Sequence, residues 1–277
     1  MLGEQRMNDF KRKMLKPLDF VFNRKFQRYA LGPNCIEIIG MRGAGKSTVY
    51  ALVAEEAKKA GKKVYCQYPY KDCYQIPVIP KDLGYWESKK FQQANGTWKE
   101  YKTWHPHIVM QVDKEWLYNT DFSNCVILLD EARTIYPARA FKDWSIADDE
   151  FFNFLRKAKV NVYLSSQEYA ALDVNVHRAV DEVWFLYKNR PNSSFTRVEV
   201  YESMTVPMEN LQKRVRLSRA KGEMYQLDWD ICGQLTRKFT FYRPPYYDLF
   251  STDFFYREFK PDDKSVLWSD EDLAQLG

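Results

Sequence analysis

Eight consecutive residues near the start of the chain have the types and spacing needed to hold phosphate groups. They fit the pattern G-x-x-x-x-G-K-[ST] and are Gly40, Met41, Arg42, Gly43, Ala44, Gly45, Lys46 and Ser47. The glycines let backbone N–H groups curl round phosphate oxygens, where a Cβ would obstruct them. The Lys46 ammonium can reach β- and γ-phosphates, and the Ser47 hydroxyl can ligate Mg²⁺. With Thr48 next in the chain, the segment predicts a binding site for a nucleoside triphosphate such as ATP.

Two carboxylates follow a second apolar run. Residues 126–129 read Val-Ile-Leu-Leu and lead directly into Asp130 and Glu131. A continuous apolar run is typical of a central parallel strand buried on both faces, and ligands of such sheets bind at the carboxyl ends of strands. We therefore expect Asp130 to hold Mg²⁺ opposite Ser47, and Glu131 to orient or deprotonate the attacking water. The pair favours ATP hydrolysis over binding alone.

A third polar strand end carries an amide. Residues 160–166 read as the next core strand, and Gln167 follows them. A glutamine at this place can contact the γ-phosphate or its water and report hydrolysis to the rest of the fold. Taken alone it is an ordinary polar strand end, but its position after the acidic strand favours the catalytic interpretation.

The segments around these residues alternate between strand and helix patterns. The apolar run 35–39 precedes the glycine-rich loop, a helix is expected from Lys46 to Ala60, and Gly61 ends it. Further elements are predicted at 63–68, 109–112, 148–159, 183–187 and 196–202. The order predicts an α/β fold with a mainly parallel central sheet, helices on both faces, and an antiparallel hairpin that extends the sheet.

Composition divides the chain into three parts. Residues 31–205 form the expected ATPase core, within which 69–107 read as an irregular, aromatic and proline-containing insertion. Residues 206–277 form an aromatic C-terminal extension that ends in an acidic stretch. Residues 1–30 form a basic aromatic arm, and its eight Lys and Arg against three acids account for the whole net charge of +5. Such an arm suits DNA phosphates, nucleobases or an anionic membrane surface, or an amphipathic helix packed on the core.

Several protein classes are excluded. No apolar run approaches the roughly 20 residues of a membrane span, and the N-terminus lacks the apolar core of a signal peptide. The five cysteines form no C-x-x-C pair, which indicates free thiols in the cytoplasm. The three histidines are too scattered to predict a metal site.

The class of nucleotide enzyme follows from what accompanies the loop. The chain has neither the N-K-x-D motif of small GTPases nor the L-S-G-G-Q signature of ABC ATPases. Residues 130–133 superficially resemble a helicase box, but 277 residues leave room for one RecA-like domain only. Nucleoside monophosphate kinases usually lack a catalytic glutamate beside the aspartate that follows this strand, called the Walker B aspartate, which here is Asp130. What remains is a RecA-like P-loop ATPase with a sensor glutamine.

These motifs resemble the FtsK–HerA superfamily of DNA-pumping ATPases, and within it the zonular occludens toxin (Zot)-type assembly ATPases of filamentous phages. The resemblance rests on the Walker A segment Gly40–Thr48, on residues 127–139 and on residues 155–167, and it covers about 31–205. It implies ATP and Mg²⁺ as ligands and a homo-oligomeric ring, hexameric in the family. Such a ring would move single- or double-stranded DNA of a viral or plasmid genome in packaging, virion assembly or transfer.

The resemblance also implies an arginine that reaches into the neighbouring subunit's site. Arg156 best matches the basic residue that the family carries there, and Arg139 is the second candidate. An ordinary surface salt bridge is the alternative for either. The chain departs from the family at residues 156–157, which read Arg-Lys in place of Arg-His, and no membrane span follows the ATPase region.

Two other functions stay open at this point. The chain could be a nucleotide-switched assembly factor that forms a ring on ATP without pumping DNA, or a P-loop kinase of small molecules. In any of these roles it could dock on a membrane or on a virion protein from the cytoplasm.

Overall fold

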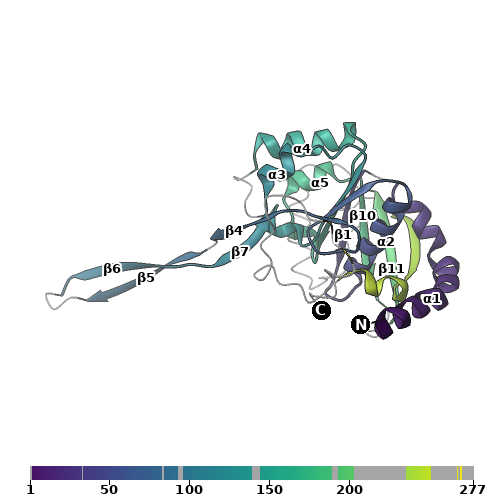
Figure 1. Cartoon of the computed structure of the whole chain (residues 1–277). Helices are drawn as coiled ribbons and strands as arrows, with labels where there is room; N and C mark the ends of the chain where they lie inside the picture. The colour runs from purple at the N-terminus through teal and green to yellow at the C-terminus, as the bar shows by residue number, and fades with distance from the viewer. Residues whose placement is uncertain are drawn as a thin grey trace.

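An eight-stranded sheet forms the centre of the protein, as Figure 1 shows. The computed structural model describes residues 2–32, 34–82, 84–92, 96–138, 144–188, 193–202, 235–250, 267 and 269. The strand order is β12-β11-β10-β1-β9-β8-β2-β3. The strands are β1 (Cys35–Gly40), β2 (Lys63–Cys66), β3 (Tyr74–Gln75), β8 (Cys125–Leu129), β9 (Asn161–Ser166), β10 (Glu182–Tyr187), β11 (Phe195–Glu202) and β12 (Leu235–Tyr242).

The sheet is parallel from β10 to β3, and β11 and β12 add antiparallel to its β10 edge. This confirms the predicted α/β fold with its hairpin extension. Strand β9 lies between β1 and β8. The carboxyl end of β9 is therefore adjacent both to the glycine-rich loop after β1 and to the acidic pair after β8.

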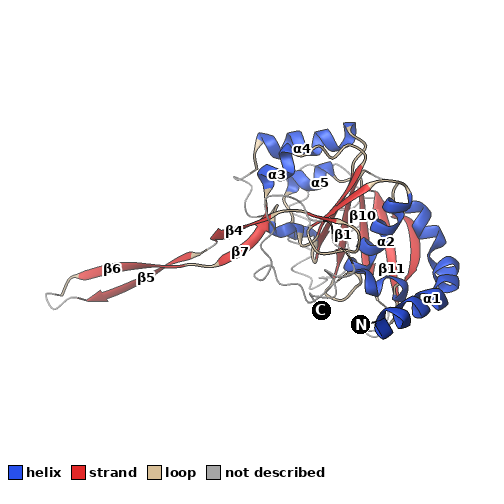
Figure 2. Cartoon of the chain, viewed as in Figure 1, coloured by secondary structure: helices blue, strands red, loops and turns tan. Residues whose placement is uncertain are grey.

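Helices cover both faces of the sheet, as predicted (Figure 2). Helix α1 (Leu2–Tyr29) and helix α2 (Lys46–Lys59) pack on one face, together with the 3-10 helix η4 (Pro244–Leu249). Helices α3 (Lys114–Asn119), α4 (Ile146–Lys157) and α5 (Val174–Ala179) pack on the other face. Alternation along β1 serves both cores, because Ile36 and Ile38 belong to the first and Cys35 and Ile39 to the second.

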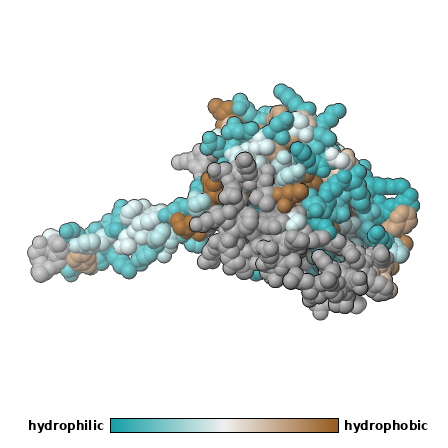
Figure 3. Space-filling view, in the orientation of Figure 1, coloured by the Kyte–Doolittle hydropathy of each residue, from teal (hydrophilic) through white to brown (hydrophobic). Residues whose placement is uncertain are grey.

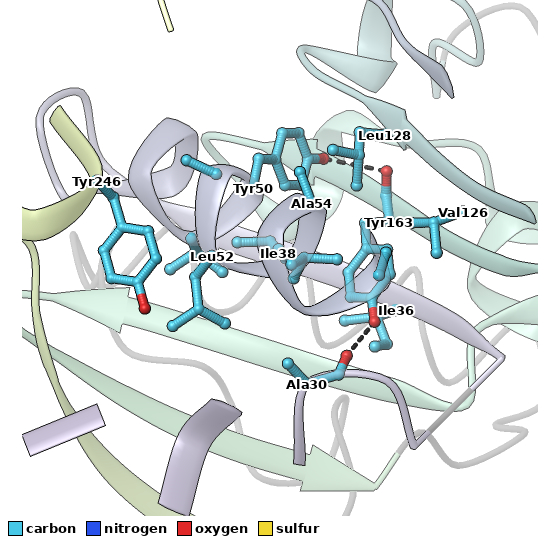
Figure 4. Packing of buried hydrophobic residues seen from close by; sticks show 14 of the residues in the cluster. Ala30, Ile36, Ile38, Tyr50, Leu52, Ala54, Val126, Leu128, Tyr163 and Tyr246 are labelled. Carbon is cyan, nitrogen blue, oxygen red and sulfur yellow. Dashed lines mark hydrogen bonds between the residues drawn. The ribbon is translucent and has the colours of Figure 1, made fainter. Parts of the chain in front are cut away.

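Helix α2 is fixed to the sheet by a buried tyrosine. The Tyr50 hydroxyl donates to the carbonyl oxygens of Leu129 at 2.9 Å and Tyr163 at 3.0 Å, which belong to β8 and β9. Figure 4 shows this ring among the aliphatic side chains of the same core, with the Tyr163 hydroxyl bonded in turn to the Ala30 carbonyl. Helix α2, which begins at the glycine-rich loop, is thus fixed in position relative to β8 and β9.

Helix ends match sequence signals with one correction. Helix α2 ends one residue before Ala60, and Gly61 follows with φ 72°, a left-handed conformation that suits glycine. The helix expected from residue 148 begins at Ile146 instead. Its cap is Ser145, whose hydroxyl bonds the Asp148 backbone N–H while the Asp148 carboxylate bonds back, so the acid is the third helical residue and not the start.

The segment 69–107, expected to be irregular, contains paired strands. Strand β4 (Val78–Asp82) pairs with β7 (Ile108–Val112), and β5 (Tyr85–Gln92) pairs with β6 (Trp98–His105), all antiparallel. Together they form a ribbon that projects from the body of the molecule (Figure 1). The prolines that suggested irregular chain are compatible with it, since strands in a two-stranded ribbon are edge strands.

Both chain ends contribute to the core. In α1, Phe26 is buried against Trp184, Phe239 and Phe241, which matches the packed-helix interpretation of residues 1–30 for this part of the helix. Strand β12 belongs to the central sheet, although residues beyond 205 were expected to lie outside the core. The described cysteines Cys35, Cys66, Cys73 and Cys125 are free thiols. None of the described helices combines the length and the apolar character that crossing a membrane requires.

Candidate functional site

The glycine-rich loop wraps tightly between β1 and α2. Gly43 and Gly45 have φ of 78° and 107°, a region that side chains with a Cβ rarely adopt. The Ala44 backbone N–H donates to the Met41 carbonyl at 3.0 Å, which closes the turn. A Cβ on Gly40 would lie 2.7 Å from the Leu186 carbonyl of β10. The loop therefore has the backbone conformation of a phosphate cradle, at the amino end of a 14-residue helix.

Lys46 is folded back onto this loop. Its ammonium donates to the Gly40 carbonyl at 2.7 Å, and its side chain is almost fully buried. Burial lowers the pKa of Lys46, and the Asp130 and Glu131 carboxylates act in the opposite direction. Lys46 and the acidic pair are thus electrostatic neighbours, as the two sequence motifs predicted they would be. The Thr48 hydroxyl donates a hydrogen bond to the Gly45 carbonyl at 2.7 Å. Of the two neighbouring hydroxyls, Ser47 is therefore the one available to a cation.

Asp130 follows β8 directly and is held by its neighbours. Its carboxylate accepts hydrogen bonds from the Ser165 hydroxyl of β9 and, at 3.0 Å, from the Glu131 backbone N–H. Burial raises the pKa of Asp130, and the Ser165 bond and the Lys46 charge lower it. A carboxylate oxygen and a serine hydroxyl are the hard ligands that Mg²⁺ prefers. No group of three or more His, Cys, Asp or Glu that could hold a metal occurs among the described residues. Asp130 and Ser47 suit an ion whose other ligands are water and phosphate oxygens.

Glu131 is oriented by contacts from two sides. It has φ 45°, an uncommon conformation for a residue with a side chain and one that concentrates at functional sites. Its Oε1 accepts a hydrogen bond from Gln167 Nε2 at 2.7 Å. Its Oε2 lies 3.2 Å from Arg133 Nε, within ion-pair distance, yet accepts no hydrogen bond within the described part of the chain. Oε1 is thus fixed by Gln167, while Oε2 is buried beside the Arg133 guanidinium.

Four predicted side chains therefore meet at one edge of the sheet. Lys46, the Asp130–Glu131 pair and Gln167 come from the ends of β1, β8 and β9. The strand order explains the meeting, because β9 inserts between the other two strands. Arg156 lies near the end of α4, and Arg139 lies outside the described residues.

Sequence reasoning missed a layer of residues that supports the loop from β11 and β12. The Thr196 hydroxyl donates to the Ala44 carbonyl at 2.6 Å. A Cβ on Gly45 would lie 2.8 Å from Thr196 Oγ1 and from Arg243 Cδ. Arg243 is 8% exposed, and its guanidinium donates to the Ser193 carbonyl. Arg243 thereby joins the loop to the part of the chain beyond residue 205, which was expected to lie outside the core.

The same layer brings positive charge to the loop. Burial lowers the pKa of Lys188, and the nearby Arg243 charge lowers it further. The Lys188 ammonium lies 3.9 Å from the position of a Cβ on Gly43. Arg243 Nε is buried and has no hydrogen-bond partner among the described residues. Two cations packed beside a phosphate cradle favour an anion there. No local signal marks these residues, and only the pairing of β10, β11 and β12 places them.

Comparisons with known proteins bear on the fold alone. No family profile matches the chain, and no curated protein matches its sequence. Among solved structures, it is similar to the N-terminal domain of zonular occludens toxin from Neisseria meningitidis, at 13% identity over 79% of this chain and 99% of that one, with a TM-score of 0.47. It is also similar to the genome packaging NTPase B204 from Sulfolobus turreted icosahedral virus 2 in complex with ATP-gammaS, at 11% identity over 62% and 92%, with a TM-score of 0.36. The fold assignment rests on the strand order described above.

Proposed function

We propose that this chain is an ATPase that uses hydrolysis to translocate DNA, in the manner of FtsK–HerA motors, during viral genome packaging, virion assembly or DNA transfer. The observation that supports hydrolysis most directly is the 2.7 Å hydrogen bond from Gln167 to Glu131, beside Asp130 and Lys46. A site for binding alone would need the cradle and the cation ligands. It would not need a glutamate oriented by an amide. The DNA substrate is inferred from the sequence resemblance.

The roles of the residues follow from their positions. The backbone N–H groups of residues 40–48 and the Lys46 ammonium bind the β- and γ-phosphates of ATP. Ser47 and Asp130 would hold Mg²⁺, which when bound neutralises charge on the phosphate oxygens. Glu131 accepts the proton of the attacking water, and the hydrogen bond from Gln167 to its Oε1 sets the orientation of the carboxylate.

A ring of identical subunits would complete the site. In such a ring an arginine from one subunit approaches the γ-phosphate held by the next and stabilises transition-state charge. Arg156, near the end of α4, is our candidate for this role, and Arg139 is the second. The basic residues of α1 would add contacts to DNA phosphates, to an anionic membrane surface or to a virion protein.

The test is the ATP hydrolysis rate of the whole protein with and without single- and double-stranded DNA, alongside its mass in solution with ATP. The proposal expects DNA to raise the rate and ATP to favour a ring. Glu131→Gln should retain ATP binding and lose hydrolysis. Ring formation without DNA stimulation would identify an assembly switch instead, and stimulation by a small phosphate acceptor would identify a kinase.

A further inference from the structure

A two-stranded ribbon projects from the nucleotide-binding body and is not used by the site above (Figures 1 and 2). We define this β-ribbon arm as strands β4 to β7, with β5 and β6 as its outer part. The eight paired positions of β5 and β6 extend over about 26 Å at the usual rise per residue. Within the described residues, β5 and β6 pair only with each other. Nearly all side chains of β5 and β6 are exposed, so both faces of the outer part can meet a partner.

One face of the outer part carries all three of its tryptophans. Trp86 is paired with Trp104, and Trp98 is paired with Gln92, an even number of positions away, so alternation places the three rings on one side. They are 63%, 37% and 67% exposed for Trp86, Trp104 and Trp98. The rings of Trp86 and Trp104 lie 5.2 Å apart at 55°. We call this side the tryptophan face.

Lysines lie between the rings on the same face. Lys90 and Lys102 share the side of the tryptophans by the same register, and neither forms an ion pair within the described part of the chain. Two of the arm's acids are already engaged. Asp82 accepts from Trp104 Nε1 at 3.0 Å and from the Gly84 backbone N–H at 2.8 Å, and Glu87 lies 3.2 Å from the Lys89 ammonium. The tryptophan face itself carries Lys90, Lys102 and Glu100, which is paired with Lys90 across the two strands, so its net charge is positive.

The composition of β5 and β6 restricts the kind of partner. The two strands read YWESKKFQ and WKEYKTWH and contain no Leu, Ile, Val, Met or Ala. A surface that inserts into a membrane combines Trp and Phe with Leu, which these strands lack, and Lys, of which they have four, is depleted in protein–protein interfaces. Figure 3 agrees, since the visible outer arm is mostly teal and near-white with only small brown patches. Flat rings alternating with lysines suit nucleobases and the phosphates that join them.

We propose that the tryptophan face binds single-stranded nucleic acid, with unpaired bases stacked on Trp86 and Trp98 and phosphates held by Lys90 and Lys102. Stacking on these rings requires bases that are not already stacked in a duplex. This inference rests on the proposed function, because it assigns part of the DNA contact of that motor to the arm. It also fixes the strandedness that the nucleotide site leaves open.

The experiment measures binding of a fluorescent oligo-dT to the whole protein by anisotropy. Trp86→Ala with Trp98→Ala should weaken binding at least 25-fold, since each stacked ring contributes about fivefold or more. The matched control is Phe91→Ala with Tyr101→Ala, which removes a stacked pair, 4.6 Å between centroids, from the opposite face. That control should change affinity less than twofold. Basal ATP hydrolysis should be unchanged in both variants, which shows that the body is folded.

A second measurement tests the lysines. Replacing Lys90 and Lys102 by Gln should make the slope of log K against log salt shallower by about 1.4, because each phosphate contact on a single strand contributes about 0.7. An unchanged slope would overturn the assignment of these two lysines to phosphates.

Three results would overturn the role of the tryptophan face. They are equal losses in the tryptophan variant and its control, equal affinity for a duplex of the same length, and tryptophan-dependent binding to anionic vesicles without binding to oligo-dT. Failure of the proposed function looks different. If DNA does not stimulate ATP hydrolysis by the wild-type protein, the proposed DNA-translocating function is contradicted, whatever the arm binds. If stimulation is normal but the tryptophan variant binds like wild type, the arm inference alone falls.

Discussion

Gln167 and Glu131 meet side chain to side chain across two neighbouring strands, with Nε2 of the amide 2.7 Å from Oε1 of the carboxylate. The amide fixes one oxygen of the glutamate that we propose as the base. A change at the γ-phosphate that moves Glu131 would move Gln167, and with it the end of β9. The contact therefore offers a physical route from hydrolysis to the rest of the fold.

Removing this amide should affect turnover more than binding. Gln167→Ala is expected to lower kcat for ATP by about 10- to 100-fold, because a misplaced base loses that much rate. The Kd for ATP should stay within about threefold, since the cradle is intact. Asn119→Ala, an amide removed from the surface of α3, is the control and should leave both constants unchanged. Equal loss of affinity and rate in Gln167→Ala would show that the amide binds nucleotide instead of positioning Glu131.

The Asp130 carboxylate should favour Mg²⁺ binding and lower the free energy of unfolding of the protein without nucleotide. Burial raises its pKa, so the ionised carboxylate destabilises the folded state, and the effect appears as pH rises through the raised pKa. Asp130→Asn cannot ionise. It should raise Tm in the absence of nucleotide and Mg²⁺ at pH 8, and the difference should vanish near pH 3, below the ordinary Asp pKa of 3.8.

The same substitution should abolish Mg²⁺-dependent hydrolysis, with a loss of at least about 100-fold. Thermal melts over the pH range and hydrolysis assays check the two halves together. If the variant is less stable than wild type at pH 8, the Ser165 and Lys46 contacts stabilise the ionised Asp130 carboxylate by more than its burial costs, which contradicts the account.

Substituting two glycines that have positive φ distinguishes the cost of backbone strain from the cost of steric crowding. Gly61→Ala should cost about 1–2 kcal/mol through its left-handed backbone alone, because nothing lies within 4 Å of the added Cβ. Gly45→Ala should cost more, since its Cβ would meet Arg243 Cδ and Thr196 Oγ1 at 2.8 Å. It should also weaken ATP binding more than tenfold, while Gly61→Ala binds like wild type. Denaturant unfolding and nucleotide titration give the comparison, and similar effects at both positions would argue against the supporting layer.

The Thr196 hydroxyl should contribute to the shape of the loop. Thr196→Val keeps the volume but removes the donor to the Ala44 carbonyl, at a cost of about 1 kcal/mol. We expect Tm to fall by about 2–4 °C and ATP affinity to fall severalfold. Thr240→Val, on the exposed side of β12, is the matched control and should change neither quantity. If Thr196→Val binds ATP as wild type does, strand β11 does not shape the cradle.

Much of the sheet could be predicted because its signals are local. The runs before Gly40 and Asp130 are continuously apolar, which is the pattern of strands buried on both faces. Helix α2 is bounded by the glycine-rich loop and Gly61, and β11 has period-two alternation of apolar and polar residues. Each of these elements is specified by neighbouring residues.

Strands β4, β5, β6 and β12 were missed, whereas residues 109–112 of β7 were predicted as a strand. Strands β5 and β6 are exposed on both faces, so they lack the alternation of apolar and polar residues that marks a half-buried strand. Strand β12 is identified by its pairing with β11, a contact between distant parts of the chain. Periodicity within a short window does not contain that information.

In the candidate site too, residues that are adjacent in the sequence could be predicted, and contacts between strands could not. The cradle residues are consecutive, and Asp130 and Glu131 are adjacent, so the sequence alone predicts them. The bond of Ser165 to Asp130 and the packing of Arg243 on Gly45 depend on which strands are neighbours. Strand order follows from the whole fold and could not be obtained from the motifs.

The most direct test of the central claim is a titration of the purified protein with Mg²⁺-ATP, wild type beside Lys46→Ala. The account predicts saturable binding by the wild type and a loss of at least about 100-fold in the variant, whose missing ammonium would otherwise meet the β- and γ-phosphates. A wild-type protein that does not bind ATP, or a variant that binds equally well, would contradict it.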